Sequence, residues 1–300
     1  MLQKAIFSFA CSWLATVCLC SAGLKVAESE TDENRSPASQ PIRAGSAKTR
    51  TSEQRAKDSA ALAQAAAGCA IRLESGQNAE LRREAIYRWS NPIAATIERE
   101  VRDAGVFVWT LNDRPVVIGS VVWYTQLGMY HEFQSLAVEP LTAEREGKKI
   151  WEPAQAGVEF KPLADTAPPA AIDARRLIQM KSIAERFRAE VIKGPPSFPA
   201  GSVWQLRLLP KPLLRYGNSS SPTRDGAIFA FCQDADPDVF LMLEARAAGD
   251  ELAWHFAMGP LTSRETKAWY GDQLIWSKPL IQPPSDSKRP YFVAGPFPVP

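Results

Sequence analysis

The sequence predicts an α+β fold: two similar antiparallel β-sheet units with short helices and one longer linking helix. Three observations lead to this prediction. Short motifs between residues 81 and 155 recur in the same order between 205 and 280, which indicates an internal duplication. In each half, β-branched and aromatic runs flank short polar turns, the pattern of a β-hairpin. An amphipathic stretch at 172–193 lies between the halves and predicts a helix.

The first unit, 59–165, is predicted around one hairpin. It pairs 105–111 with 116–125 across a polar link. The second of these runs is apolar at nearly every position, so we expect a strand that is covered on both faces. A further strand is expected near 130–138.

The second unit, 201–283, repeats this pattern. Its hairpin pairs 226–232 with 239–246. Glu244 and Arg246 interrupt the apolar run of the second strand, so we expect one wetter end there. The two units together would pack as a pseudo-dimer.

Helical segments are predicted at two further places. Within the connection 166–200, the apolar side chains of 172–193 form one stripe and basic side chains fill the other face, which predicts the linking helix. Thr262 and Glu265 have the spacing of a capping box, which predicts a short helix. The proline-rich tail, 284–300, is expected to be extended and irregular.

The composition is that of an ordinary globular protein. Of 300 residues, 45% are apolar and 23% are charged, which excludes collagen-like, coiled-coil and wholly disordered chains. The 35 Lys and Arg nearly balance the 33 Asp and Glu. This balance gives no support to nucleic-acid binding, so no nucleic-acid partner is predicted.

The first 22 residues have the pattern of a secretory signal peptide. Lys4 gives the positive start, an apolar run follows, and small residues precede a cleavage point after Ala22. A membrane anchor is disfavoured, because roughly 15 apolar residues fall short of the roughly 20 that span a bilayer. We expect a secreted or periplasmic bacterial protein with no transmembrane segment after cleavage. Residues 23–58, which are polar and charged, predict a disordered spacer.

Two cysteines remain once the signal is removed, Cys69 and Cys232. An oxidising compartment permits a disulfide, but nothing in the sequence fixes their separation, so a bridge and two unpaired buried thiols both remain open. Cys69 lies in an Ala-rich stretch, 60–73, of helical periodicity and has no histidine near it in sequence. This isolation argues against a nucleophilic role.

The duplication also predicts equivalent charged pairs. Arg88 and Asp103 in the first unit correspond to Arg215 and Asp225 in the second. Because each arginine stands among apolar neighbours, we expect two structural ion pairs, one in each unit.

Candidate catalytic residues are few. The chain has two histidines, His131 and His255, which the duplication places in equivalent strands. Together with Glu132 they would make a metal-assisted hydrolase site. Neighbouring strand residues face opposite sides of a sheet, which argues against Glu132 joining His131. We therefore expect the histidines to lie in separate cores, and we predict no metal site and no cofactor.

Other motifs give little. Residues 234–238, Asp-Ala-Asp-Pro-Asp, begin like a calcium loop, but Val239 and Ala245 stand where that loop needs Gly and Glu. A hairpin loop is therefore predicted. Phosphate loops, nucleophile elbows and the His-Glu-x-x-His motif are missing from the sequence.

The runs at 88–92, 106–110, 131–136 and 225–231 resemble an uncharacterised family of predicted secreted bacterial proteins. The resemblance covers roughly residues 80–280. It implies export and a globular fold, and it carries no mechanism because the family has no assigned activity. The sequence therefore predicts an exported, non-enzymatic protein with a binding or structural role and an unknown protein or small-molecule partner; the alternative is the hydrolase of His131, Glu132 and His255.

Overall fold

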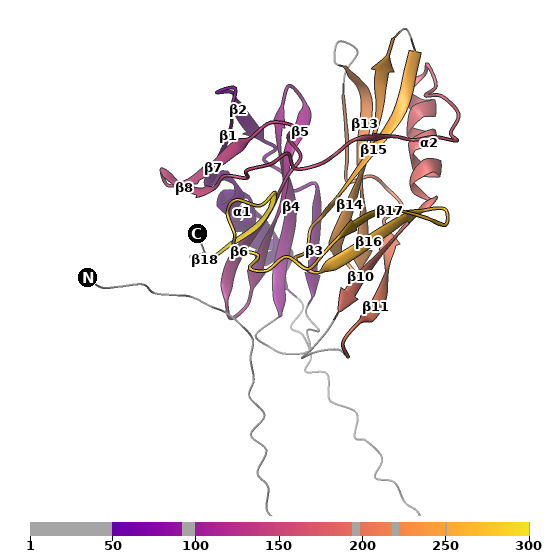
Figure 1. Cartoon of the computed structure of the whole chain (residues 1–300). Coiled ribbons are helices and arrows are strands. Elements are labelled where there is room, and N and C mark those ends of the chain that lie inside the picture. The colour runs from indigo at the N-terminus through magenta and orange to yellow at the C-terminus, as the bar shows by residue number, and fades with distance from the viewer. Residues whose placement is uncertain (1–49, 92–99, 194–198, 218–221, 250, 300) are drawn as a thin grey trace, which may run out of the picture. The chain divides into compact units, whose positions relative to one another are not determined.

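The computed structural model describes residues 50–91, 100–193, 199–217, 222–249 and 251–299 (Figure 1). The predicted signal peptide, 1–22, and residues 23–49 of the predicted spacer lie outside the described residues. The described ranges hold two antiparallel sheets and only two helices, so the predicted α+β class is corrected to mainly β.

The first sheet has the strand order β18-β6-β5-β4-β2-β1-β7-β8, and β3 also pairs with β4. Every pairing in it is antiparallel. Its strands are β1 (Cys69–Leu73), β2 (Asn78–Leu81), β3 (Tyr87–Asn91), β4 (Val101–Leu111), β5 (Arg114–Tyr124), β6 (Gly128–Ser135), β7 (Leu141–Arg145), β8 (Lys148–Trp151) and β18 (Tyr291–Phe297).

The second sheet has the order β17-β16-β10-β11-β13-β14-β15-β9, with β12 paired to β13. Its strands are β9 (Lys161–Pro162), β10 (Phe187–Lys193), β11 (Ser202–Leu208), β12 (Leu214–Tyr216), β13 (Thr223–Gln233), β14 (Asp236–Ala248), β15 (Glu251–Pro260), β16 (Glu265–Tyr270) and β17 (Gln273–Lys278). Apart from β18 and β9, the two sheets follow one succession of strands: β6-β5-β4-β2-β1-β7-β8 matches β15-β14-β13-β11-β10-β16-β17.

The two remaining strands complete the outer edges next to β6 and β15. Strand β18, within the tail that was predicted to be irregular, pairs with β6 of the first sheet, although it follows the whole second sheet in sequence. Strand β9 precedes the second sheet's other strands and pairs with β15. The tail prediction is corrected, because β6 offers an open row of backbone donors and acceptors that 291–297 can satisfy.

Helix α1 (Ser52–Ala67) starts within the predicted spacer and ends before the predicted helical stretch does. Thr51 forms a complete capping box with Gln54, which fixes the start of the helix. The chain then turns at Gly68 and continues as β1. The spacer prediction is therefore corrected for 52–58, where the cap and buried Leu62 further along stabilise a helix that composition alone did not indicate.

Helix α2 (Asp173–Ala184) is shorter than the linking helix predicted at 172–193. The rest of that stretch is β10, in which alternate residues from Phe187 to Lys193 are buried. The predicted helix after Thr262 is likewise a strand, β16, which pairs with β10 and β17. In both places partner strands were available, and hydrogen bonding to them outweighs a local helical or capping pattern.

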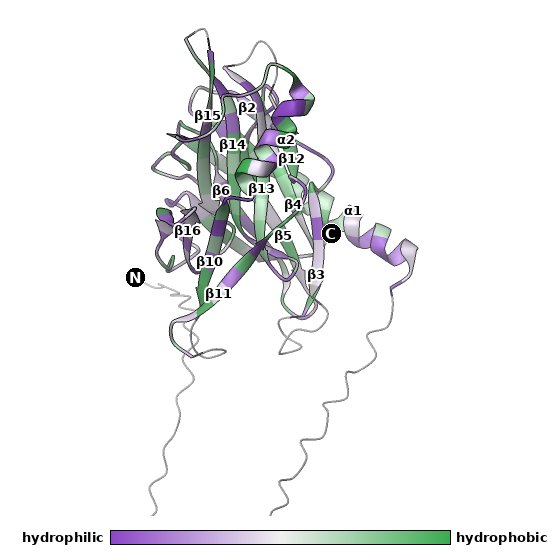
Figure 2. Ribbon diagram, turned by 90° about the vertical axis from the view of Figure 1, so that its right-hand side faces the viewer, coloured by the Kyte–Doolittle hydropathy of each residue, from purple (hydrophilic) through white to green (hydrophobic). Residues whose placement is uncertain are grey.

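Three apolar clusters account for most of the core. One lies between α1 and the first sheet, and one lies between α2 and the second sheet. The third joins the facing sides of the two sheets and includes Val106, Val108, Ile118, Ile228, Phe240 and Met242. Figure 2 shows the hydrophobic residues running along strands such as β13 and β14.

The central strands are therefore covered on both faces. For β5 this confirms the prediction, since eight consecutive residues from Pro115 to Val122 are buried. For β14 the predicted wetter end consists of half-buried Arg246 and exposed Ala247 and Ala248, whereas Glu244, expected to belong to it, is fully buried. Among the described residues, neither helix combines the length and apolar character that crossing a membrane requires.

Candidate functional site

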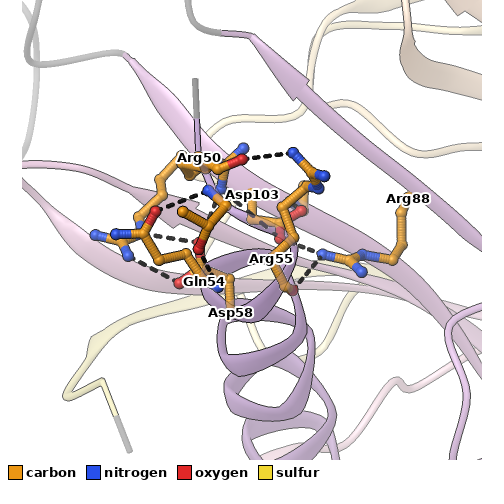
Figure 3. Close-up of polar contacts among 9 residues, drawn as sticks. Arg50, Gln54, Arg55, Asp58, Arg88 and Asp103 are labelled. Atoms are coloured by element: carbon orange, nitrogen blue, oxygen red, sulfur yellow. Dashed lines mark hydrogen bonds and ion pairs between the residues drawn. The ribbon is translucent and has the colours of Figure 1, made fainter. Parts of the chain in front are cut away.

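A network of charged side chains joins the start of α1 to the neighbouring strands (Figure 3). Asp58 accepts hydrogen bonds from Arg50 Nη1 and Arg102 Nη2, each at 2.8 Å. Burial acts to raise the pKa of Asp58, but the two arginines outweigh burial and lower it. Arg88 on β3 forms an ion pair with Asp103 on β4, as the sequence predicted.

The second unit has the corresponding pair beside α2. Arg215 on β12 binds Asp225 on β13 at 2.6 Å, which confirms the other predicted ion pair. Arg176 on α2 also binds Asp225, with 2.9 Å between Nε and Oδ2. The helix is thus fastened to the sheet through a carboxylate that two guanidinium groups share.

Each of these arginine–aspartate pairs stands beside a cavity. The α2 pocket, of about 450 Å³, opens between α2, β12 and the start of β13. Its lining is mainly polar: Ala171, Asp173, Arg176, Arg215, Tyr216, Gly217, Arg224, Asp225 and Leu252. Three arginines against two aspartates leave one excess positive charge in the lining.

The α1 pocket, of about 530 Å³, lies beside α1 and Arg88 in the first unit. Its lining is richer in small and apolar side chains: Ala56, Ser59, Ala60, Leu62, Ala63, Arg83, Glu84, Ala85, Arg88 and Phe107. The two pockets therefore take corresponding places beside the two helices but offer different chemistry.

Two of the three arginines of the α2 pocket are engaged by the protein. Arg176 donates to Asp225, to Asp173 and to the backbone oxygens of Ala170 and Ala171. Arg215 donates through Nε and Nη2 to the Asp225 carboxylate and through Nη2 to the backbone oxygen of Asp173. Arg224 is exposed and makes no hydrogen bond or ion pair within the described ranges. Among the described residues, therefore, nothing occupies its guanidinium group.

The strand register gives no support to the alternative in which His131 and His255 share one site. His131 on β6 and His255 on β15 do lie in corresponding strands, but one residue out of register. Val121 and Leu243 hold matching places in the two hairpins; Val121 pairs with His131, whereas Leu243 pairs with Phe256. A slip of one residue turns a side chain to the opposite face, so the two imidazoles belong to different environments.

His131 is buried against a cysteine. Its Nδ1 lies 3.6 Å from Cys69 Sγ, and Arg145 Nη1 lies 3.7 Å from the same sulfur. Burial and then the Arg145 charge lower the pKa of His131 to about 3, so its imidazole is neutral. Burial raises the pKa of Cys69 despite Arg145. His255 is partly buried, and its Nδ1 lies 3.4 Å from the backbone oxygen of Ala253.

Glu132 faces away from His131 and meets the hairpin loop that resembled a calcium loop. Burial, which is the largest cause, and then the Asp238 carboxylate raise the pKa of Glu132 to about 8, and the nearby Tyr291 hydroxyl opposes this rise. The pKa of Asp238 is raised to about 6 by burial, against the opposing charges of Arg264 and Lys193. Asp238 Oδ2 is buried without a hydrogen-bond partner in the described part of the chain. At neutral pH this group of carboxyls therefore retains a proton.

The described residues contain no group of three or more His, Cys, Asp or Glu arranged to hold a metal ion. The two cysteines are free, and both are buried, so of the two alternatives the structure has the unpaired thiols. No family model, curated protein or solved structure matches this chain.

The sequence analysis did not predict two polar sites, the α2 pocket and the contact between Cys69 and His131. Arg224 stood within the repeated Arg-Asp motif, so the duplication pointed to it, but nothing indicated a cavity beside it. Cys69 and His131 are 62 residues apart in sequence, and only the folded sheet brings them together.

Proposed function

We propose that the chain is an exported, non-enzymatic binding protein made of two copies of one β unit, and that the α2 pocket binds a small molecule carrying a carboxylate or phosphate group. Export is supported by the pattern of the first 22 residues. Duplication is supported by the ordered sequence motifs and by the common succession of strands in the two sheets.

The observation that carries the ligand proposal is the guanidinium group of Arg224, which has no partner in the described part of the chain and lines a cavity of about 450 Å³. Arginine binds carboxylates and phosphates through two parallel hydrogen bonds, which fixes orientation as well as affinity. Arg215 stands beside it and is held in place by Asp225. A ligand would thus meet one adaptable and one preorganised arginine.

The pocket favours binding over catalysis. Its two carboxylates are already occupied by arginines: Asp225 accepts from Arg176 and Arg215, and Asp173 accepts from Arg176. Its described lining contains no histidine, cysteine or lysine. The groups that remain available are donors, which suit recognition of an anion.

Calorimetric titration of the full chain with inorganic phosphate, acetate and succinate tests the proposal. We expect saturable binding of at least one of these probes, weakened about 10- to 100-fold in Arg224→Ala because one charge-assisted pair is worth roughly 1.5–3 kcal/mol. Arg224→Lys should retain part of the affinity. Arg83→Ala, in the α1 pocket, is the matched control and should bind like the parent.

Two results would count against the proposal. Failure of all three anions to bind would remove the ligand class, and equal affinity of Arg224→Ala and the parent would remove the site. Phosphate binding without carboxylate binding, or the reverse, selects between the two chemical sources.

A further inference from the structure

The buried cluster of Cys69, His131 and Arg145, here called the thiol cluster, has a defined geometry. Cys69 begins β1 and pairs with Arg145, the last residue of β7. His131 comes from β6, which β5, β4 and β2 separate from β1 in the sheet. The sheet curls so that Cys69 Sγ and His131 Nδ1 meet at 3.6 Å. Cys69 is 3% and His131 is 1% exposed.

The second sheet shows what this place contains when it serves packing alone. The matching positions hold three aromatic residues, Phe187, Phe256 and Tyr270. Phe187 begins β10 and pairs with Tyr270, the last residue of β16, just as Cys69 pairs with Arg145. The Phe187 ring lies 5.5 Å from that of Phe256 and 4.7 Å from that of Tyr270. The same topology therefore folds around a purely aromatic group, and the fold does not require a polar one.

The thiol cluster is also incompletely satisfied. His131 Nε2 is buried and has no hydrogen-bond partner in the described residues. Leaving such a group unpaired costs its full desolvation penalty, which a phenylalanine at this place avoids. A buried polar group kept at this cost points to chemistry that uses it.

Phe297, the last residue of β18, covers one side of the cluster. The Phe297 ring lies 5.2 Å from the His131 ring, and Arg145 Cζ lies 4.2 Å from its centroid. Around it, Gly295, Pro296 and Pro298 are exposed. Since β18 is an edge strand and its pairing is irregular between Ala294 and Phe297, this segment can open without unfolding the sheet.

We propose that Cys69 and His131 form a gated thiol–imidazole site, which reacts with small disulfides when the end of β18 lifts away. While the site is closed, the thiol and the imidazole are both neutral, and Cys69 is unreactive. On opening, the Cys69 proton passes to His131 Nδ1, and Arg145 stabilises the thiolate. The thiolate attacks one sulfur of the disulfide, the S–S bond breaks, and the other half leaves as a thiolate, so that Cys69 carries a mixed disulfide.

Thiol labelling with 5,5′-dithiobis(2-nitrobenzoate) tests this proposal. In the full chain, Cys11, Cys18, Cys20 and Cys232 are replaced by Ser, so that only Cys69 reports. We expect Phe297→Ala to raise the labelling rate about tenfold or more, because it removes the cover. Adding His131→Phe, the residue type of the second unit, should cancel most of that rise while preserving the packing.

The matched comparison is the chain in which Cys232 is the only thiol. Burial first, and then nearby aspartates, raise the pKa of Cys232 to about 12, and no hydrogen bond joins this thiol to a histidine among the described residues. We expect Cys69 to label faster than Cys232 even without Phe297→Ala. Equal rates would mean that both thiols react only after global unfolding, and this would overturn the proposal. An unchanged rate in Phe297→Ala, or an equal rise with His131→Phe present, would also overturn it.

Discussion

Glu244 is a buried charge at the contact between the two sheets. It is fully buried on β14, and its carboxylate accepts hydrogen bonds from Tyr216 at 2.7 Å, Thr223 at 3.1 Å and Arg246 at 2.6 Å. Arg114, from the first sheet, lies 3.2 Å from Oε1. Four elements therefore converge on one carboxylate. Glu244→Gln keeps the shape and removes the charge.

The magnitude follows from these contacts. A glutamine side chain has one acceptor, its oxygen, and one donor, its amide nitrogen. The amide nitrogen would face O–H and N–H groups and could not accept hydrogen bonds from them. Arg246 and Arg114 would keep their charges without a counter-ion. Removing one partner from a buried charge pair costs about 3–5 kcal/mol, and we expect Glu244→Gln to lower the free energy of unfolding by this amount.

Equilibrium unfolding in urea, followed by tryptophan fluorescence, measures the effect. Glu80→Gln, at an exposed position on β2, is the control and should change the free energy of unfolding by no more than about 0.5 kcal/mol. A double-mutant cycle with Arg114→Ala should give a coupling energy of at least about 0.5 kcal/mol, since the pair links the sheets. If Glu244→Gln destabilises no more than the control, the assignment of this carboxylate to a buried charge network is refuted.

The remaining predictions concern packing, capping and pH. Gly157→Ala would place a Cβ 1.8 Å from the backbone oxygen of Ser135, so calorimetry should show a lower melting temperature, with a cost of about 1–3 kcal/mol; an unchanged melting temperature contradicts the close contact. Thr51→Ala should cost about 0.5–2 kcal/mol through loss of the α1 capping box, and Ser52→Ala, beside it, should cost less. His131 has its pKa lowered from 6.5 to about 3, so its contribution to stability is present above pH 6.5 and is lost as pH falls toward 3; His131→Phe should flatten this acid limb of the melting temperature. Glu132 has its pKa raised from 4.5 to about 8, so its contribution is present below pH 4.5 and is lost as pH rises through 8; Glu132→Gln should flatten the alkaline limb, and parallel curves for parent and variant would contradict the shift.

The sequence predicted those features that depend on neighbouring residues. Both hairpins form, and their turns lie where polar residues separate the β runs, with Asn112, Asp113 and Asp234 at positive φ as tight turns need. The two arginine–aspartate pairs were also predicted. The motifs recur in the same order in both halves, and this order aligns the arginine and the aspartate of one pair with those of the other.

The features that were not predicted depend on partners distant in sequence. Phe187 and Val191 fit a helical stripe and a strand alternation alike, and the presence of β11 and β16 on either side decides for the strand. The sequence motifs place both histidines directly after an aromatic residue, and only the strand register shows that His255 stands one residue away from the place that corresponds to His131. The contact of Cys69 with His131 requires the curl of a sheet, which no local pattern encodes.

Strand β18 has a consequence for the order in which the chain can be completed during synthesis. The first unit is translated first, yet its sheet lacks the edge strand β18 until residues 291–297 have been synthesised. In that strand Tyr291 pairs with Gln134, and more than half of the chain separates the two residues. Until then β6 presents an unpaired edge, the kind of surface that recruits strands from other molecules. Such distant closure also slows folding, since the entropy of a long loop is lost before the contact forms. We infer that ribosome-bound or interrupted chains are the aggregation-prone species of this protein, and that a factor shielding the β6 edge would act during this interval.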